Sequence, residues 1–378
     1  MFLKGVRILD FSHYIPGPFA SLRLADLGAE VVKVEPPTGD LARSDGNNYS
    51  YDYIFQANNV NKKSISLNLK NQSDLEIARG LIRKADVLIE GFRPGVMARL
   101  GLGYEDVQKL NGRIIYCSIT GYGQTGELAQ QGSHDINYMS LSGMLAQLKD
   151  DAGRPIHPSM TFADMIGSIV ATEQILAALI ARERSGRGMY LDISLLDGLL
   201  AMMNVHFLVE HHTGYGKGVK QLAGTIVSYC LYETKDGRFV SLAALERKFW
   251  ENFCNALGKN DWLEYHESPV CCDNRVYQDM CTMFQSKTLS EWIEFGKKVD
   301  CCLTPVLEVH EAKALFSDGT YREMIHLRND KIQIGTRYDP AIWNARIRAP
   351  RLNEHREEII KSWIETNINV NVKEENVQ

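Results

Sequence analysis

The sequence has few features of a secreted, redox-active or metal-binding protein. It contains eight cysteines among 378 residues, and none of them forms a CxxC spacing. Two pairs are adjacent, Cys271 with Cys272 and Cys301 with Cys302, and neighbouring cysteines rarely pair with each other. No apolar leader precedes the first strand-like residues. We therefore expect a cytoplasmic protein whose thiols are mostly buried and reduced.

Long apolar runs, an excess of basic charge and a dinucleotide fingerprint are also missing. No apolar run approaches the ~18 residues of a membrane span, which predicts a protein without a membrane partner. The net charge is −5, from 42 Lys and Arg against 47 Asp and Glu, and this argues against a general nucleic-acid surface. GxGxxG is absent, which disfavours an NAD-dependent enzyme without eliminating that class.

The sequence does contain an alternation of strand-like and helix-like segments. Hydrophobic residues make up 44% and charged residues 24%, which is typical of globular proteins. Strands are expected at residues 6–11, 31–35, 64–69, 85–90 and 114–119, and helices at 19–27, 73–84 and 165–184. This order predicts an α/β fold with an open, parallel, Rossmann-like sheet.

The length of the chain exceeds the usual size of one hydrophobic core, so we expect two domains. Residues 206–220 turn polar and glycine-rich and are interpreted as a linker. A smaller α+β domain is expected at 221–314, with a hairpin that turns at Asp236 and Gly237. A further helix is expected at 349–364, after a proline.

Asp164 stands where the long predicted helix begins. A carboxylate at that place can be an ordinary cap for backbone N–H groups. It can also be a general acid or base, or a nucleophile, because Gly167 and Ser168 would let a ligand approach closely. The sequence alone leaves both interpretations open.

His134 and Glu246 are weaker candidates by themselves. His134 lies in a polar loop, where it is either a surface residue or a base whose ring is oriented by Asp135. Asp135 could equally cap the helix that follows. Glu246 precedes a helical segment, and taken alone it is best interpreted as an exposed carboxylate at a helix start.

Basic and amide side chains occur in two turns of the predicted sheet. Asn61, Lys62 and Lys63 precede one strand, and Arg93 follows another within the sequence GFRPG. Lys and Arg in such turns can hold phosphate groups. Most residues of this kind are simply solvated.

Taken together, several ordered stretches resemble the family III coenzyme A transferases. That family includes carnitine coenzyme A transferase, formyl-coenzyme A transferase and α-methylacyl-coenzyme A racemase. The resemblance runs through nearly the whole chain. It is carried by GVRILDFSHYIPGPFASLRLADLGAEVVKVEPP, NVNKKSISLNLK, EGFRPGVMARLGLGY, SITGYGQTG, ERSGRGMYLDISLLDGLL and PRLNEHREEII.

The resemblance also bears on the branch within the family. Asp164 matches the Asp that transferases of this family use as a nucleophile. His134, in SHDINY, matches the second base of the racemase branch, and Glu246, in ALERKFW, matches a racemase-type Glu. The late CCLTPVL is also racemase-like, and no glycine-rich loop occurs in the small domain. The chain departs from the racemase pattern at Met160, Glu127 and Ser133.

The resemblance implies a 1,1-proton transfer at the α-carbon of a 2-methylacyl-coenzyme A, between Asp164 and His134 on opposite faces. Tyr138 and Glu246 would support the site. A first alternative is coenzyme A transfer between carboxylic acids through an anhydride of Asp164. A second is a coenzyme A-binding protein that has lost catalysis. Coenzyme A belongs to the substrate, and neither a metal nor a prosthetic group is implied.

The resemblance further implies an architecture and a set of ligand contacts. Residues 1–205 and 330–378 would form one large domain, with the small domain inserted and 315–329 as a second linker. Two ring-shaped chains would interlock as a homodimer, with each site between the large domain of one chain and the small domain of the other. The residues that match coenzyme A-contacting loops are Arg93, Asn61, Lys62 and Lys63.

Overall fold

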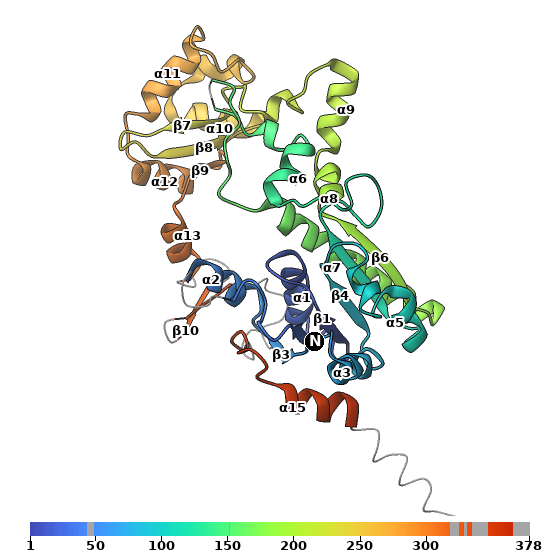
Figure 1. Ribbon diagram of the computed structural model, residues 1–378. Coiled ribbons are helices and arrows are strands. Elements are labelled where there is room, and N and C mark those ends of the chain that lie inside the picture. The colour runs from blue at the N-terminus through green and yellow to red at the C-terminus, as the bar shows by residue number, and fades with distance from the viewer. Residues whose placement is uncertain (44–48, 151, 318–324, 329–330, 335–346, 366–378) are drawn as a thin grey trace, which may run out of the picture. The chain divides into compact units, whose positions relative to one another are not determined.

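The computed structural model describes residues 1–43, 49–150, 152–317, 325–328, 331–334 and 347–365. The chain divides into two compact units (Figure 1). The larger unit joins Met1–Met202 to Met324–Gln378, and the smaller unit is Met203–Glu323. Each unit has its own hydrophobic core and is described by itself.

The larger unit is built on a six-stranded sheet in the order β3-β2-β1-β4-β5-β6. All neighbouring strands are parallel, which confirms the predicted α/β fold with an open parallel sheet. Strand order reverses between β1 and β4, and ligands of open α/β sheets bind at such a point, outside the carboxyl ends of the strands. The strands are β1 Arg7–Asp10, β2 Glu30–Glu35, β3 Lys62–Ser66, β4 Val87–Glu90, β5 Ile115–Thr120 and β6 Met189–Ser194.

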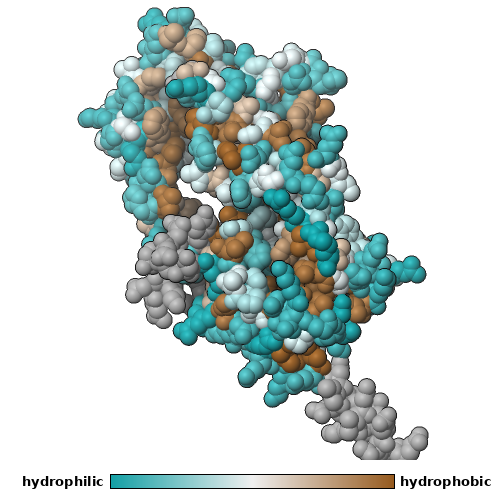
Figure 2. Space-filling view, viewed as in Figure 1, coloured by the Kyte–Doolittle hydropathy of each residue, from teal (hydrophilic) through white to brown (hydrophobic). Residues whose placement is uncertain are grey.

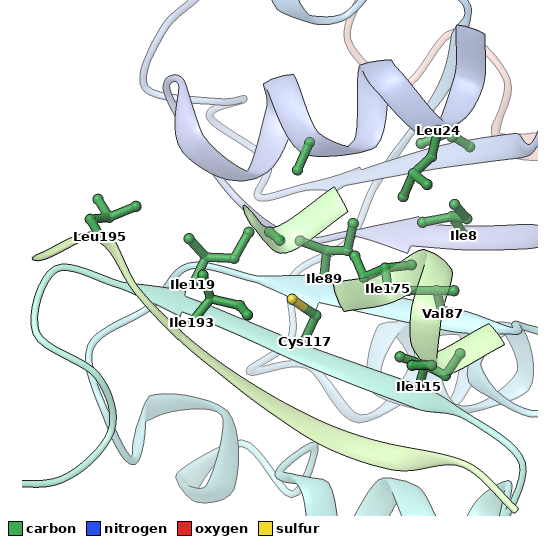
Figure 3. Packing of buried hydrophobic residues seen from close by; sticks show 14 of the residues in the cluster. Ile8, Leu24, Val87, Ile89, Ile115, Cys117, Ile119, Ile175, Ile193 and Leu195 are labelled. Atoms are coloured by element: carbon green, nitrogen blue, oxygen red, sulfur yellow. The ribbon is translucent and has the colours of Figure 1, made fainter. Parts of the chain in front are cut away.

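Helices cover both faces of this sheet, so its central strands are apolar on both sides, as buried parallel strands are. Ile115 and Cys117 of β5 pack with one set of helices (Figure 3), whereas Tyr116 between them faces the other. The first face is covered by α1 Pro16–Asp26, α6 Asp135–Leu141, α7 Phe162–Ser185 and α8 Leu195–Met202. The second is covered by α3 Gln72–Ile82, α4 Val96–Arg99, α5 Tyr104–Leu110 and α15 Arg356–Ile359.

Helix α7 is the longest element, with 24 residues. Its length, and a mean hydropathy of 1.5 over 18 of its residues, would also suit a membrane span. This differs from the expectation that the sequence holds no apolar run of that length. Its buried residues, among them Ala171 and Ile175, lie in the core beside the sheet. A core helix passes the same test, so the composition of α7 decides nothing about a membrane.

The smaller unit contains a three-stranded antiparallel sheet in the order β7-β8-β9. The predicted hairpin is present, and Gly237 has the left-handed backbone (φ 70°) that its turn requires. Three buried tryptophans, Trp250, Trp262 and Trp292, fill the core. The elements are α9 Asn204–Thr213, β7 Tyr229–Glu233, β8 Phe239–Ala243, α10 Arg247–Leu257, α11 Arg275–Phe284, α12 Leu289–Lys298, β9 Leu303–Pro305 and α13 Val309–Leu315.

Two expected linkers and one helix limit need correction. Residues 206–213 are not a linker but part of α9 (Asn204–Thr213). Gly214, which follows the helix, has a left-handed backbone (φ 72°). Within 315–329, Ile325–Arg328 forms β10, which pairs with β11 (Lys331–Ile334); residues 318–324 and 329 lie outside the described part. The tail helix begins at Arg356 rather than at 349, because His355 donates its N–H to the Ser64 carbonyl of β3 (3.0 Å) and aligns the preceding chain with that strand.

One helix outside both sheet faces completes the larger unit. Helix α2 spans Tyr49–Asn58 and precedes β3. After it, Asn61 adopts a left-handed backbone (φ 63°), a conformation that asparagine tolerates better than most residues. This residue therefore turns the chain into β3.

Candidate active site

The amino end of α7 lies at the carboxyl edge of the parallel sheet. Ser168 Oγ donates to the Pro16 carbonyl oxygen (2.7 Å), in the connection that follows β1. A Cβ on Gly167 would lie 2.2 Å from Leu195 Cδ2, just after β6. The two small residues therefore let α7 pack closely on the fold, which differs from the expected role of admitting a ligand. This packing places Asp164, in the first turn of α7, near the point where strand order reverses.

Asp135 caps α7. Its Oδ1 accepts the backbone N–H of Asp164 (3.0 Å), and the N–H groups of Phe162 and Ala163 also donate to its carboxylate. Thr161, at the usual capping position, makes no such bond, so the free N–H groups of the helix start find their acceptor on α6 instead. The expectation that Asp135 orients His134 or caps its own helix is therefore replaced by a contact between two helices.

The same contact places two carboxylates side by side. Burial, and secondly the negative charge of Asp135, raise the pKa of Asp164 to about 7. Burial also raises the pKa of Asp135, although the three backbone N–H groups oppose that shift. A carboxyl with a pKa near 7 is suited to give and take protons at neutral pH.

His134 precedes Asp135 and is the N-cap residue of α6. Its backbone N–H donates to Asn137 Oδ1 (3.0 Å), and the residue is exposed. Since Asp135 bonds to the first turn of α7, the chain brings His134 and Asp164 to the same pair of helix starts. His134 is therefore one residue away from the contact that joins α6 to Asp164.

Tyr138 holds the loop before His134. Its hydroxyl accepts from Ser133 Oγ (2.9 Å) and donates to the Ser133 carbonyl oxygen (3.2 Å). The residue is buried, and burial raises the pKa of its hydroxyl. A Cβ on Gly121 would lie 2.2 Å from this hydroxyl, so glycine is required there. Tyr138 thus positions the loop, and the unusual Ser133 is one of its partners.

Arg93 lies beside the same loop. A Cβ on Gly132 would be 2.8 Å from Arg93 Nη2, and Gln130 Nε2 donates weakly to the Pro94 carbonyl oxygen (3.4 Å). Arg93 is exposed, and its guanidinium has no hydrogen bond or ion pair within the part of the chain that the structure describes. An unpaired guanidinium at this edge of the sheet suits an anionic ligand.

The other predicted ligand contacts lie elsewhere. Asn61, Lys62 and Lys63 stand at the start of β3, which is the opposite edge of the parallel sheet from Arg93. Lys63 pairs with Glu30 and Glu358, each at 2.8 Å. These residues and Arg93 do not converge on one surface.

Lys62 is fully buried. Its ammonium donates to Asp10 Oδ2 (3.0 Å), the Pro18 carbonyl oxygen (2.8 Å) and Asn59 Oδ1 (2.8 Å). These three bonds use all of its donors. A direct contact with a phosphate is therefore not available to Lys62 in this arrangement, because the residue is fully buried and its three donors are engaged.

Glu246 belongs to the smaller unit. It is the N-cap residue of α10, is exposed and makes no side-chain cap bond. Burial raises the pKa of the Cys302 thiol, and the negative charge of Glu246 raises it further. The ALERKFW and CCLTPVL stretches therefore lie close together within this unit.

Sequence reasoning missed Glu90, the last residue of β4. It is buried beside Ser118, accepts the Phe92 N–H (2.8 Å), and burial raises its pKa to about 7. It lines a cavity of about 120 Å³ together with Arg93 and Tyr190. A carboxylate that ends an apolar strand was the available signal. Within the described ranges, no group of three or more His, Cys, Asp and Glu could hold a metal ion.

Comparisons with known proteins show the family of the chain. The model of CoA-transferase family III matches residues 3–356. Succinyl-CoA:glutarate CoA-transferase of Mus musculus is 32% identical over 384 residues, covering 95% of this chain and 86% of that protein. Alpha-methylacyl-CoA racemase of Homo sapiens is 30% identical over 374 residues, covering 96% and 94%.

Solved structures show the same fold. A CAIB/BAIF family protein from Brucella suis superposes with a TM-score of 0.78 at 26% identity, over 94% of this chain and 97% of that one. A hypothetical protein from Mycobacterium tuberculosis gives 0.80 at 26% identity, over 94% and 98%. The chain therefore belongs to CoA-transferase family III and is a CoA-transferase or acyl-CoA racemase of that family.

Proposed function

We propose that the protein moves a proton at the α-carbon of a 2-methylacyl-coenzyme A and so interconverts its two configurations. The observation that carries the proposal is the pairing of Asp164 with Asp135, next to His134. A nucleophile alone does not need a pKa near 7 or an adjacent histidine, whereas a pair of acid–base groups benefits from both.

The α-proton of a thioester is too weakly acidic to be lost to an unassisted side chain. In one direction the Asp164 carboxylate takes the proton, and the His134 imidazolium returns one to the opposite face. In the other direction His134 takes the proton and the protonated Asp164 returns one. Each enantiomer therefore needs one of the two residues unprotonated and the other protonated. Backbone N–H groups at the start of α6 are the candidate donors for the enolate oxygen.

Arg93 is the group proposed to hold a coenzyme A phosphate. Its guanidinium is exposed at the carboxyl edge of the sheet, beside the loop that carries His134. The bond of Tyr138 to Ser133 would keep that loop in place while the thioester binds. Glu246 stays a proposed supporting residue, contributed by the smaller unit.

Deuterium incorporation tests the proposal. The purified protein is incubated in D₂O with a 2-methylacyl-coenzyme A and no acceptor acid, and uptake at the α-carbon is followed by mass spectrometry. We expect uptake by the wild type that is lost in both His134→Ala and Asp164→Ala. His157→Ala, which removes an exposed loop histidine, is the matched control. Full racemisation by His134→Ala would contradict a two-base reaction.

Coenzyme A transfer through an anhydride of Asp164 is the second candidate. It is favoured by the 32% identity to a succinyl-CoA:glutarate CoA-transferase. Here Asp164 would attack the thioester carbonyl to form a first acyl anhydride and release the coenzyme A thiolate. The thiolate would attack the Asp164 carbonyl of that anhydride, which expels the first acid and leaves an Asp164 thioester. The acceptor carboxylate would attack this thioester to form the second anhydride and release the thiolate again, and the thiolate would then take the second acyl group and free Asp164. Without deuterium uptake, thioester exchange with added succinate or glutarate that depends on Asp164 and survives His134→Ala would establish this reaction.

We also propose that the protein acts as a homodimer, as the family resemblance implies. Helix α9 has no buried residue and exposes Val205, Phe207 and Leu208, and apolar surface is visible on both units (Figure 2). In the family arrangement, each site would take Asp164 from one chain and Glu246 from the other. A heterodimer of one Asp164→Ala chain and one Glu246→Gln chain would then have one site in which both residues are intact. Co-expressed, differently tagged chains that stay inactive would argue for sites within one chain.

A further inference from the structure

Three charged side chains lie buried together beneath residues 12–18, the connection that leads from β1 into the first turn of α1. Asp10, Lys33 and Lys62 are each 0% exposed. The ammonium groups of Lys62 and Lys33 lie 3.0 Å and 4.0 Å from the same Asp10 oxygen, Oδ2. Lys33 also pairs with Asp40 (2.8 Å), so the cluster is balanced in charge. Burying such groups is costly unless they are fully paired, so their hydrogen-bond partners are part of what stabilises this region.

The cluster holds both ends of the connection. At its start, Asp10 Oδ1 accepts the Ser12 N–H (3.0 Å) and Lys33 donates to the Ser12 carbonyl oxygen (2.6 Å). At its end, Lys62 donates to the Pro18 carbonyl oxygen (2.8 Å). The two ammonium groups therefore tie carbonyl oxygens at both ends of this segment to the buried cluster.

The middle of the connection touches the helix that carries Asp164. The hydroxyl of Ser168 lies 2.7 Å from the Pro16 carbonyl oxygen and 2.6 Å from the Asp164 carbonyl oxygen, so its single proton is shared between them. Ser168 is 0% exposed and lies one turn after Asp164. Lys62 is thus linked to the backbone of Asp164 by two hydrogen-bond contacts, at Pro18 and at Pro16, that are joined by the backbone of residues 16–18.

We propose that the cluster of Asp10, Lys33 and Lys62 positions Asp164 for reaction through the Pro16–Ser168 contact. Lys62 is then a positioning residue for Asp164 instead of a contact for coenzyme A. The inference rests on the proposed role of Asp164 as the reacting carboxylate. It holds for proton transfer and for acyl transfer alike, because both need that group within about 3–3.5 Å of the reacting atom.

The charge state of Lys62 agrees with this role. Burial lowers the pKa of Lys62 to about 8; the charge of Asp10 opposes that shift, and Lys33 adds to it. The ammonium form, which alone can donate to three acceptors, therefore prevails at neutral pH. Asp10, Lys33 and Asp40 are the charged groups that face it.

Ser168→Ala removes the link to α7 without touching the charged cluster. Misplacing a reacting group by about 1 Å can cost on the order of 100-fold in rate, so we expect kcat to fall by roughly 10- to 100-fold with KM for the thioester unchanged. Thr172→Val is the matched control. Thr172 is buried one turn further on, and its hydroxyl, like that of Ser168, donates to the carbonyl oxygen four residues before it, here that of Ser168 (2.8 Å), while the Ala20 carbonyl oxygen of α1 is 3.5 Å away. Thr172→Val therefore removes a hydroxyl of the same kind that makes no contact with Pro16, and its kcat should stay at the wild-type value.

Lys62→Met tests the cluster itself. If both residues act through one route, the double variant Lys62→Met with Ser168→Ala will lose no more activity than the more affected single variant. Hydrogen exchange followed by mass spectrometry supplies a readout that does not need turnover: residues 162–168 should exchange faster in Lys62→Met than in Thr172→Val. If Lys62→Met does not fold, Ser168→Ala takes its place in this comparison.

The outcomes separate the two proposals. Wild-type kcat in Ser168→Ala, or equal losses in Ser168→Ala and Thr172→Val, would overturn the positioning role. So would unchanged exchange at residues 162–168. A wild-type protein that turns over no thioester, combined with faster exchange in Lys62→Met, would leave the structural link standing and remove the proposed function.

Discussion

Asp164 donates its backbone N–H to the Asp135 carboxylate (3.0 Å), while the side chains of the same two residues repel each other. One carboxylate therefore does two things. It satisfies the free N–H groups at the start of α7, and it helps burial to hold the Asp164 pKa near 7. The same bond joins the starts of α6 and α7, and His134 is the residue that precedes Asp135.

Asp135→Asn should separate these two effects. The amide oxygen can still accept the N–H groups of α7, but the negative charge is gone, so the Asp164 pKa should fall. The acid limb of the pH–rate profile, measured as deuterium incorporation or coenzyme A transfer, should then move to lower pH. Asp197→Asn, an exposed aspartate of α8, should leave the limb in place. A limb at the wild-type position in Asp135→Asn would assign the Asp164 shift to burial alone.

Much of the larger unit could be predicted because its signal is local. Strands such as β4 (VLIE) and β5 (IYCSIT) are short, mostly apolar runs, and such patterns can be recognised without knowledge of tertiary contacts. Residues 206–213 were harder. The polar, glycine-rich stretch His211–Gly218 suggested a linker from residue 206 onward, yet residues 206–213 belong to α9, which buries none of its residues. A helix without a buried face leaves no apolar periodicity to detect.

The sequence offered candidates for single site residues, but it did not reveal contacts between distant segments. Asp164 and His134 were predicted from their local sequence and from the family resemblance, and their roles stay predictions. The cap that Asp135 provides for α7 spans 29 positions, and no local pattern reveals it. Lys62 and Lys63 show the same limit, because adjacent residues of a strand point to opposite faces: one runs into the buried cluster and the other pairs with Glu358.

Arg93→Gln should raise KM for the acyl-coenzyme A and leave kcat nearly unchanged. Its guanidinium has no ion pair in the described ranges of the chain, so its loss affects the ligand more than the fold. Lys63→Gln is the comparison, since its ammonium is engaged with Glu30 and Glu358. Steady-state kinetics at two salt concentrations would measure both. A larger KM effect at Lys63 than at Arg93 would place the phosphates at the start of β3.

Gly121→Ala should disturb Tyr138. The new Cβ would lie 2.2 Å from the tyrosine hydroxyl and 2.4 Å from its ring, so the side chain must move away from Ser133. Such overpacking costs about 1–3 kcal/mol, and the displaced loop should lower activity. Gly112→Ala has its nearest contact at 3.8 Å and serves as the control. Calorimetry and kcat for both variants measure the effect, and equal results would show that the loop does not depend on Tyr138.

Glu90→Gln should make the protein more resistant to unfolding at alkaline pH. Burial holds the Glu90 pKa at about 7, above its ordinary value of 4.5. A carboxyl whose pKa is raised by folding binds its proton more strongly in the folded state. Its contribution to stability is therefore complete below pH 4.5, declines as the pH rises and is lost above pH 7.

Glutamine keeps an acceptor for the Phe92 N–H and does not ionise, so the variant avoids this loss. The difference between variant and wild type should be larger at pH 8.5 than at pH 5, by on the order of 1–3 kcal/mol, or a few degrees in Tm. Glu105→Gln, an exposed glutamate of α5, should show the same difference at both pH values. If Glu90→Gln behaves like Glu105→Gln, the buried carboxyl is already ionised at pH 5, and water or a bound cation must reach the cavity that it lines.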